Sequence, residues 1–314
     1  MKKDVFSIVG QSLPKIDAWA KVTGETKYAD DLVLPRMAYA KLLRSPHGHA
    51  RIVAIDTVRA RALPGVYGVI TGYDLPRVKF GILPVSQDEE ALCTEKVRMV
   101  GDAIAAVAAV DEATAERACE LIDVQYEVLK PLMSIEESLA HPEIRIHDYG
   151  DGPNVHKNVA LQFGDVEQAF AESYLVREDV FYYEGNTHLP MEQHAAVAAC
   201  GPDGKLTLWS STQTPHYVHR ALAKVLELPP SQIRVIACPN GGGFGGKSDP
   251  FSHELVVSRL SQKTGRPHFI ESLQTATSWL NGSLLPPKPP PLGVAITRMC
   301  AGSISSTLAS ARCT

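Results

Sequence analysis

The stretch Asn240-Gly-Gly-Gly-Phe-Gly-Gly-Lys-Ser248 decides how the rest of this chain is interpreted. It fits two phosphate-binding patterns at once: G-x-x-x-x-G-K-[ST] of the P-loop, and G-x-G-x-x-G of the dinucleotide-binding turn. The β-branched run 232–237 before it predicts a strand, and the apolar spacing after it predicts a helix over about 251–264. Asp249-Pro250 is the expected N-cap and first-turn proline of this helix. A strand, a glycine loop and a helix therefore follow one another.

Neither nucleotide pattern is complete. Pro239 and Asn240 separate the strand from the glycines. A P-loop also needs a magnesium-holding acid at the end of another strand, and a dinucleotide turn needs an acidic residue about 20 residues later. Glycines at this density let the backbone approach a ligand closely, and Phe244 among them predicts an aromatic wall beside a site. Nucleotide binding through Gly241 to Ser248 stays open as an alternative.

Composition describes an ordinary globular chain. It has 314 residues, a formal net charge of −4 and 45% hydrophobic residues, enough for about two domains. No basic patch predicts nucleic-acid binding, and no apolar run approaches the ~20 residues of a membrane helix. The six cysteines form no C-x-x-C pair, so the sequence predicts neither zinc nor iron–sulfur ligation. The N-terminus lacks the apolar region of a secretory signal, which makes a cytoplasmic location the expectation.

The first half predicts a small mixed α/β domain over 18–130, after an N-terminal extension at 1–17. Asp111 is the expected N-cap of a helix whose residues Ala115, Ala118, Cys119 and Ile122 share one face. The expected strands are 37–44, 50–57, 65–71, 103–110 and 124–129.

A proline-bearing linker at 131–155 leads to a second region at 156–267. Its expected strands are 159–163, 174–183 and 206–211, and Thr214-Pro215 is expected to begin a helix. Gln213 therefore lies at a strand-to-helix junction, where a polar side chain either faces a ligand or bonds the adjacent helix end.

The character of the chain changes after Pro267. Residues 268–314 are nearly uncharged and show no sustained period, and they contain the run Pro286-Pro-Lys-Pro-Pro-Pro291. We interpret this tail as aberrant low-complexity sequence, frameshifted or disordered.

Several ordered motifs carry a family resemblance. Lys21-Val-Thr-Gly-Glu-Thr-Lys-Tyr28, Arg44-Ser-Pro-His-Gly-His-Ala-Arg-Ile52 and Lys96-Val-Arg-Met-Val-Gly-Asp102 resemble the α/β-hammerhead domain of the molybdopterin-binding large subunit of the xanthine dehydrogenase and aldehyde oxidase family. Met191-Glu-Gln-His194, Ser211-Thr-Gln213 and the glycine loop follow in the family's order and spacing. The resemblance covers about 18–267, and the hammerhead region looks closest to the α subunit of 4-hydroxybenzoyl-CoA reductase.

The resemblance implies an α+β fold: a hammerhead domain followed by an incomplete molybdopterin-binding domain. It also implies a molybdopterin cofactor, in its cytosine dinucleotide form, with no direct protein ligand to the metal. Gln213 would donate a hydrogen bond to the metal's oxo ligand. Gly242, Gly243, Phe244 and Gly245 would border the cofactor, with Phe244 and Ser248 lining the substrate. Xanthine-converting members carry a glutamate where this chain has Ser248, so purine recognition is not expected.

The family's general-base glutamate has no counterpart in this chain, so no catalytic residue is assigned and the fragment is expected to be inactive alone. A complete relative would be an oxidoreductase that hydroxylates an aromatic, heterocyclic, aldehyde or acyl-CoA substrate with water-derived oxygen; the 4-hydroxybenzoyl-CoA reductase branch would instead remove a ring hydroxyl. It would work with an iron–sulfur small subunit and an FAD-binding medium subunit. A second alternative is a non-catalytic fragment that folds only as far as the hammerhead domain.

Overall fold

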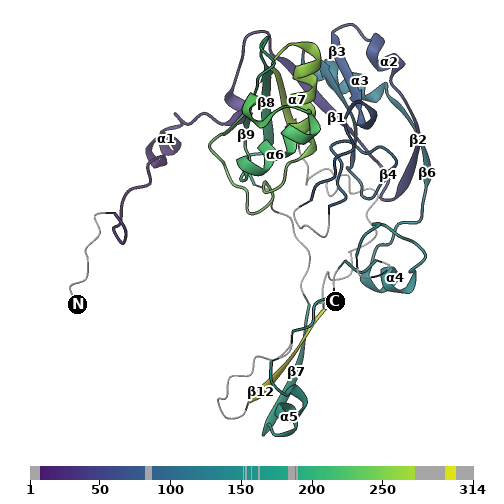
Figure 1. The fold of residues 1–314 in the computed structure, drawn as a ribbon, viewed down its shortest axis with the longest axis vertical. Helices are drawn as coiled ribbons and strands as arrows, with labels where there is room; N and C mark the ends of the chain where they lie inside the picture. The colour runs from purple at the N-terminus through teal and green to yellow at the C-terminus, as the bar shows by residue number, and fades with distance from the viewer. Residues whose placement is uncertain are drawn as a thin grey trace.

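The structure, a computed structural model, describes residues 8–81, 87–150, 152, 154–156, 158–161, 163–182, 188, 190–272 and 294–301. Its central element is a seven-stranded sheet in the order β10-β9-β8-β11-β1-β5-β3 (Figure 1). Strands from both halves of the sequence share this sheet. The alternative in which only the hammerhead region folds is therefore wrong for the described chain.

The elements predicted in the first half are confirmed, within one or two residues at their ends. Asp111 caps α3 by accepting a hydrogen bond from Thr114 N at 2.7 Å, and the predicted apolar face of this helix is buried. The strands are β1 (Ala38–Arg44), β2 (Ala50–Asp56), β3 (Val66–Thr71), β4 (Lys96–Val97), β5 (Ala103–Ala109) and β6 (Asp123–Val128). The helices are α1 (Ala18–Thr23), α2 (Val58–Ala62), α3 (Glu112–Glu120) and α4 (Ile135–Ala140), with short 3-10 turns η1 (Ala29–Asp31) and η2 (Gly72–Asp74).

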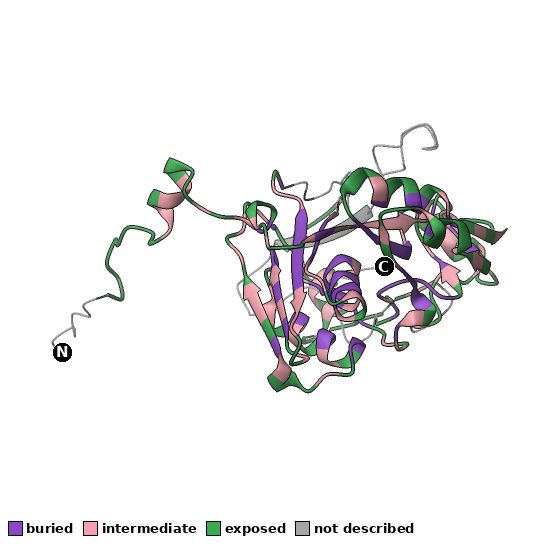
Figure 2. Cartoon of the chain, turned by 90° about the horizontal axis from the view of Figure 1, so that it is seen from above, coloured by how far each residue is buried: buried purple, intermediate pink, exposed green. Residues whose placement is uncertain are grey.

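The second half completes the large sheet and covers one face of it. Helices α6 and α7 pack in a core cluster that contains Leu208, Leu222 and Leu260, all fully buried. Figure 2 shows buried residues, in purple, in the interior of the sheet and its covering helices. The elements are α5 (Val166–Ala171), β7 (Leu175–Tyr182), β8 (His194–Cys200), β9 (Leu206–Ser210), α6 (Pro215–Val225), η3 (Pro230–Gln232), β10 (Ile233–Ala237), α7 (Ser252–Thr264), β11 (His268–Ser272) and β12 (Val294–Ala301).

Two local predictions in this half are wrong. The described residues of 159–163 form no strand. Helix α7 is capped at Phe251 rather than at Asp249, because the Glu254 carboxylate reaches back to accept a hydrogen bond from Phe251 N at 3.1 Å. Its end is as predicted, since Gly265 takes the left-handed conformation at φ 65°.

The predicted boundary at Pro267 is also wrong, because the sheet continues beyond it. β11 lies between β1, to which it is parallel, and β8, to which it is antiparallel, and Ile270 is fully buried between them. The described residues 294–301 of the supposed tail form β12, which pairs with β7 antiparallel. The remainder of 273–314 lies outside the described residues. Among the residues that the structure describes, no helix is long and apolar enough to span a bilayer.

The position of β11 generates a stability prediction. Ile270→Ala should lower the free energy of unfolding by about 2–5 kcal/mol, because it removes a fully buried side chain from the centre of the sheet. Val53→Ala, at a side chain that is 65% exposed, is the control and should change little. Urea unfolding followed by circular dichroism measures both. Equal effects of the two substitutions would contradict the central position of β11.

A second prediction concerns Glu254, which lies in the core and accepts hydrogen bonds from Ser210 Oγ and Phe251 N. Burial raises the pKa of Glu254 to about 7, so between about pH 4.5 and 7 the folded chain binds more protons than the unfolded chain. This contribution to stability is therefore present at low pH and lost as the pH rises through 7. Relative to Glu254→Gln, the wild-type chain should lose roughly 3 kcal/mol of unfolding free energy from pH 5 to 8. If the unfolding free energies of the two proteins changed in parallel with pH, a raised pKa of Glu254 would be excluded.

Candidate functional site

The candidate site lies at the carboxyl ends of β9 and β10. These two strands pair in parallel, so the segments that follow them emerge at the same edge of the sheet. Gln213 follows β9, and the glycine loop follows β10. The backbone N–H of Gln213 donates to Lys247 O at 2.8 Å, which joins the two segments directly.

Gln213 is oriented by the loop. Its Oε1 accepts hydrogen bonds from Gly245 N and Lys247 N, both at 3.2 Å, and lies 3.5 Å from the Ser248 hydroxyl. With the oxygen turned toward the loop, the Nε2 group has no acceptor among the described residues. The side chain therefore offers an amide donor outward from a fixed position.

The tip of the loop offers more donors of the same kind. The backbone N–H groups of Gly242, Gly243 and Phe244 find no acceptor in the described part of the chain. Gly243 is buried, Gly242 is half-buried and Phe244 is exposed. Phe244 has φ 49°, a left-handed conformation that is uncommon for a bulky residue, and its ring is 75% exposed. Strain of this kind persists where the surrounding structure enforces it, and it is common at ligand sites.

Steric constraints explain why glycines are required around this tip. A Cβ atom at Gly243 would lie 2.5 Å from Gln213 Oε1, and one at Gly241 would lie 2.7 Å from the Cβ of Glu192. A Cβ at Gly246 would approach the His188 ring to 2.9 Å. The loop therefore packs closely against its supports, and side chains at these positions would displace it.

Beneath the loop lies a buried ion pair. Glu192 Oε2 accepts hydrogen bonds from Gly241 N at 2.7 Å and from Lys247 Nζ at 2.6 Å. The side chains of Lys247 and Glu192 are 1% and 9% exposed. Asn240 extends the contact, because its Oδ1 lies 3.5 Å from Lys247 Nζ and its Nδ2 donates to Ser211 O. One carboxylate oxygen thus holds both ends of the loop.

His194 supports the loop from β8. Its Nε2 lies 2.8 Å from Gly246 O, and its ring packs edge-on against Phe251 and His253. Burial lowers the pKa of His194 to about 4, so the ring is neutral at pH 7. Because a carbonyl only accepts, Nε2 must carry the proton and donate it to Gly246 O.

This geometry contradicts the P-loop alternative. A P-loop lysine extends toward the β- and γ-phosphates, whereas Lys247 is buried and paired with Glu192. In addition, α7 begins at Ser252, several residues after the loop, so its N-terminus does not continue the glycine turn.

The structure brings Gln213, Gly242, Gly243, Phe244, Gly245 and Ser248 together at one edge of the sheet. Sequence reasoning assigned no role to Glu192, His194, Lys247 or Asn240. Glu192 and His194 lie in the motif Met191-Glu-Gln-His194 that contributed to the resemblance. The sequence held one signal for the Glu192–Lys247 pair: an acidic residue beside an apolar strand, and a lysine in the glycine loop. A lysine that is buried needs a countercharge, so the two residues could have been matched.

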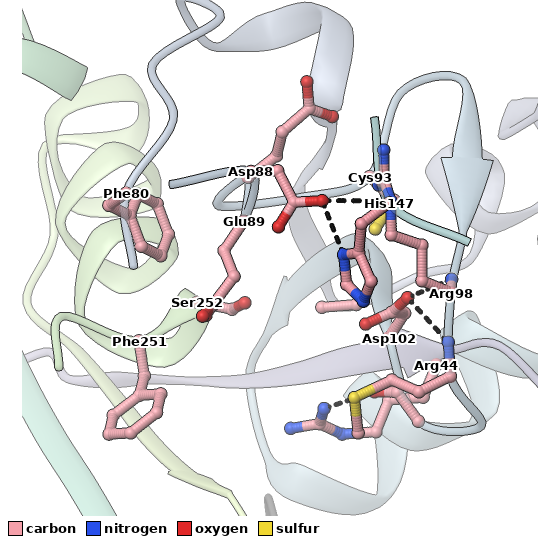
Figure 3. A pocket seen from close by; sticks show the side chains of 14 residues that line it. Arg44, Phe80, Asp88, Glu89, Cys93, Arg98, Asp102, His147, Phe251 and Ser252 are labelled. Atoms are coloured by element: carbon pink, nitrogen blue, oxygen red, sulfur yellow. Dashed lines mark hydrogen bonds and ion pairs between the residues drawn. The ribbon is translucent and has the colours of Figure 1, made fainter. Parts of the chain in front are cut away.

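A separate cavity of about 190 Å³ is lined by the hammerhead region, by His147 of the segment that follows it, and by Phe251 and Ser252 at the start of α7 (Figure 3). In it, buried Asp88 lies between His147, at 2.7 Å, and Arg98, at 3.3 Å. Burial and neighbouring carboxylates raise the pKa of Glu89 to about 7. The described residues contain no group of three His, Cys, Asp or Glu side chains that could hold a metal ion.

The buried pair generates a third prediction. Lys247→Met should lower the free energy of unfolding by about 3–5 kcal/mol, because the Glu192 carboxylate would stay buried without its countercharge. Lys205→Met, which breaks the exposed pair with Asp203, is the matched control and should leave the unfolding midpoint unchanged within error. Urea titrations compare them, and equal midpoints would place Lys247 in solvent rather than beneath the loop.

Two known protein families match this chain, one over the first region and one over the second. Residues 23–130 match the family described as "Aldehyde oxidase and xanthine dehydrogenase, a/b hammerhead domain". Residues 146–275 match "Molybdopterin cofactor-binding domain", a range that includes β11 and the whole glycine loop.

Individual relatives cover most of this chain. It is 40% identical over 252 residues to a probable xanthine dehydrogenase subunit of Bacillus subtilis (strain 168), covering 80% of this chain and 33% of that protein. It is 40% identical over 268 residues to the nicotinate dehydrogenase large molybdopterin subunit of Eubacterium barkeri, covering 85% and 61%. The chain thus spans about a third of the first relative and less than two thirds of the second.

Solved structures show the same fold. Quinoline 2-oxidoreductase from Pseudomonas putida 86 aligns with a TM-score of 0.76 at 35% identity, covering 84% of this chain and 34% of that chain. Aldehyde oxidoreductase from Desulfovibrio gigas aligns with a TM-score of 0.76 at 32% identity, covering 84% and 30%. The chain belongs to the xanthine dehydrogenase and aldehyde oxidase family of molybdopterin-dependent oxidoreductases, as part of a large subunit.

Proposed function

We propose that the edge formed by Gln213 and the glycine loop is one face of a molybdopterin site in a molybdenum hydroxylase-type large subunit. The observation that carries the proposal is a set of donors that have no acceptor among the described residues: Gln213 Nε2 and the N–H groups of Gly242, Gly243 and Phe244. All four are neutral, and they lie at a loop where added Cβ atoms would collide with its supports. This donor set fits an oxo-bearing group better than a polyphosphate, which is commonly held by a free lysine.

When bound, the cofactor would supply the molybdenum redox chemistry by which a carbon centre is hydroxylated with oxygen derived from water. This chain's residues would bind and orient. Fixed donors that point at an oxygen where charge develops can each stabilise the transition state by about 2.7–4 kcal/mol. Phe244, exposed beside these donors, would border the substrate and exclude water from one side of it.

The substrate is proposed as an aromatic heterocycle or an aldehyde. Ser248 lies beside Gln213 and provides a short neutral hydroxyl where xanthine-converting members carry a glutamate, which disfavours purines. Relatives with nicotinate dehydrogenase and quinoline oxidoreductase in their names support a heterocyclic ring. The placement beside 4-hydroxybenzoyl-CoA reductase, with reductive removal of a ring hydroxyl, stays a prediction.

The other parts of the reaction are proposed to lie outside this chain. They are the general base, most pterin contacts, and an iron–sulfur subunit and an FAD subunit that would accept the electrons. The relatives named as subunits support such an assembly. The cytosine dinucleotide form of the cofactor is likewise part of the proposal.

Anaerobic titration of the purified chain with molybdenum-loaded molybdopterin, followed by pterin fluorescence, tests the proposal. We expect saturable binding that Gln213→Ala weakens about tenfold to a hundredfold, the effect of losing a hydrogen bond to a charged group. Gln125→Ala, on the exposed strand β6, is the control and should bind as the wild type does. Binding that Gln213→Ala leaves unchanged, or saturable binding of ATP or NAD in place of the cofactor, would contradict the proposal.

A further inference from the structure

We infer that Glu192 is a positioning residue, which fixes the first half of the glycine loop and holds the Lys247 ammonium beneath it. Two different side chains hold the two halves of the loop. Gln213 Oε1 binds the second half, at Gly245 N and Lys247 N. Glu192 Oε2 binds the first half, at Gly241 N. The residues left between these two attachments are the ones whose N–H groups are free.

Burial shows that the contact is specific. The Glu192 side chain is 9% exposed, and its other oxygen, Oε1, is buried without a donor among the described residues. The carboxylate is therefore held through Oε2 alone, by one backbone group and one ammonium. Gly241 must be glycine for this approach, since a Cβ there would lie 2.7 Å from the Cβ of Glu192.

Charge explains why the pair matters for the ligand. With its ammonium 2.6 Å from Glu192, Lys247 forms a neutral pair under the loop. If Glu192 were absent, the ammonium would lose the partner that makes its burial possible and would move toward water. The free donors of the loop would then lie beside a positive charge, which favours phosphate over a metal oxo group. The ligand in this step is the cofactor of the proposed function, on which this part of the inference rests.

Two double variants separate positioning from stability. Glu192→Met with Lys247→Met replaces the pair by apolar side chains, which is often neutral for stability, but leaves Gly241 N without an acceptor. Glu192→Gln with Lys247→Met also removes both charges, yet retains an amide oxygen that can accept from Gly241 N. If Glu192 and Lys247 only stabilised the fold, the glycine loop would have the same conformation in both variants.

The experiment is amide hydrogen exchange of the cofactor-free chain, resolved by NMR, with urea midpoints measured in parallel. We expect similar midpoints for the two double variants. We expect Gly241 N–H to exchange about tenfold faster or more in the Met/Met variant than in the Gln/Met variant, the effect of one lost hydrogen bond. Equal Gly241 protection in the two variants would overturn the inference.

If the double variants fail to fold, the wild-type chain still decides, because its Gly241 N–H must exchange more slowly than those of Gly242 and Phe244, which are not buried and have no acceptor among the described residues. Equal rates would overturn the inference. Titration with molybdenum-loaded molybdopterin keeps the two proposals distinguishable. Equal binding by the wild-type chain and Gln213→Ala contradicts the proposed function and leaves the exchange result standing, whereas equal binding by wild type and the Met/Met variant contradicts the positioning role.

Discussion

The fold depends on the pairing of β11 with β1 on one side and with β8 on the other. Through this pairing, three strands of the hammerhead region and four strands of the cofactor-binding region become one sheet. Ile270 is buried where the two regions meet, and α7, immediately before β11, covers the same sheet. The edge at which β9 and β10 end is therefore attached to a continuous core, so the loop that follows β10 has a rigid base.

On this base, the glycine loop combines two opposite requirements. The backbone polar groups at its ends need hydrogen-bond partners, and Glu192, Gln213 and His194 provide them. The N–H groups at its tip must remain without a partner in the protein, because N–H groups that bond within the protein cannot bind a ligand. Glycine permits both, since the backbone can approach each support closely and adopt positive φ between them. The donors are preorganised by contacts that the ligand does not make.

Much of the fold could be predicted from local patterns. The face of α3 and its Asp111 cap follow from period and capping chemistry, and both are found. β8 was missed because its Ala-rich sequence, buried on both faces, shows no alternation. The N-cap of α7 was misplaced because Asp249-Pro250 gives a stronger local signal than the Glu254 side chain that caps Phe251. β11 was missed because the sequence changes character close to it.

The site was less predictable than the fold. The glycine loop and Phe244 indicated a close approach to a ligand, but their pattern fitted several ligands, and the role of Gln213 came from family resemblance. The Glu192–Lys247 pair joins residues 55 positions apart, so no local rule predicts it. This long-range contact is what distinguishes the loop from a P-loop of the same sequence pattern.

The most direct test is a map of backbone and side-chain amide NMR shifts in this chain as molybdenum-loaded molybdopterin is added. We expect the largest changes at the N–H groups of Gly242, Gly243 and Phe244 and at the Gln213 side-chain amide. Gly241 and Lys247, bonded within the protein, should change less. Binding that leaves the loop tip unchanged and shifts the residues around Asp88 and Glu89 instead would contradict the proposed site.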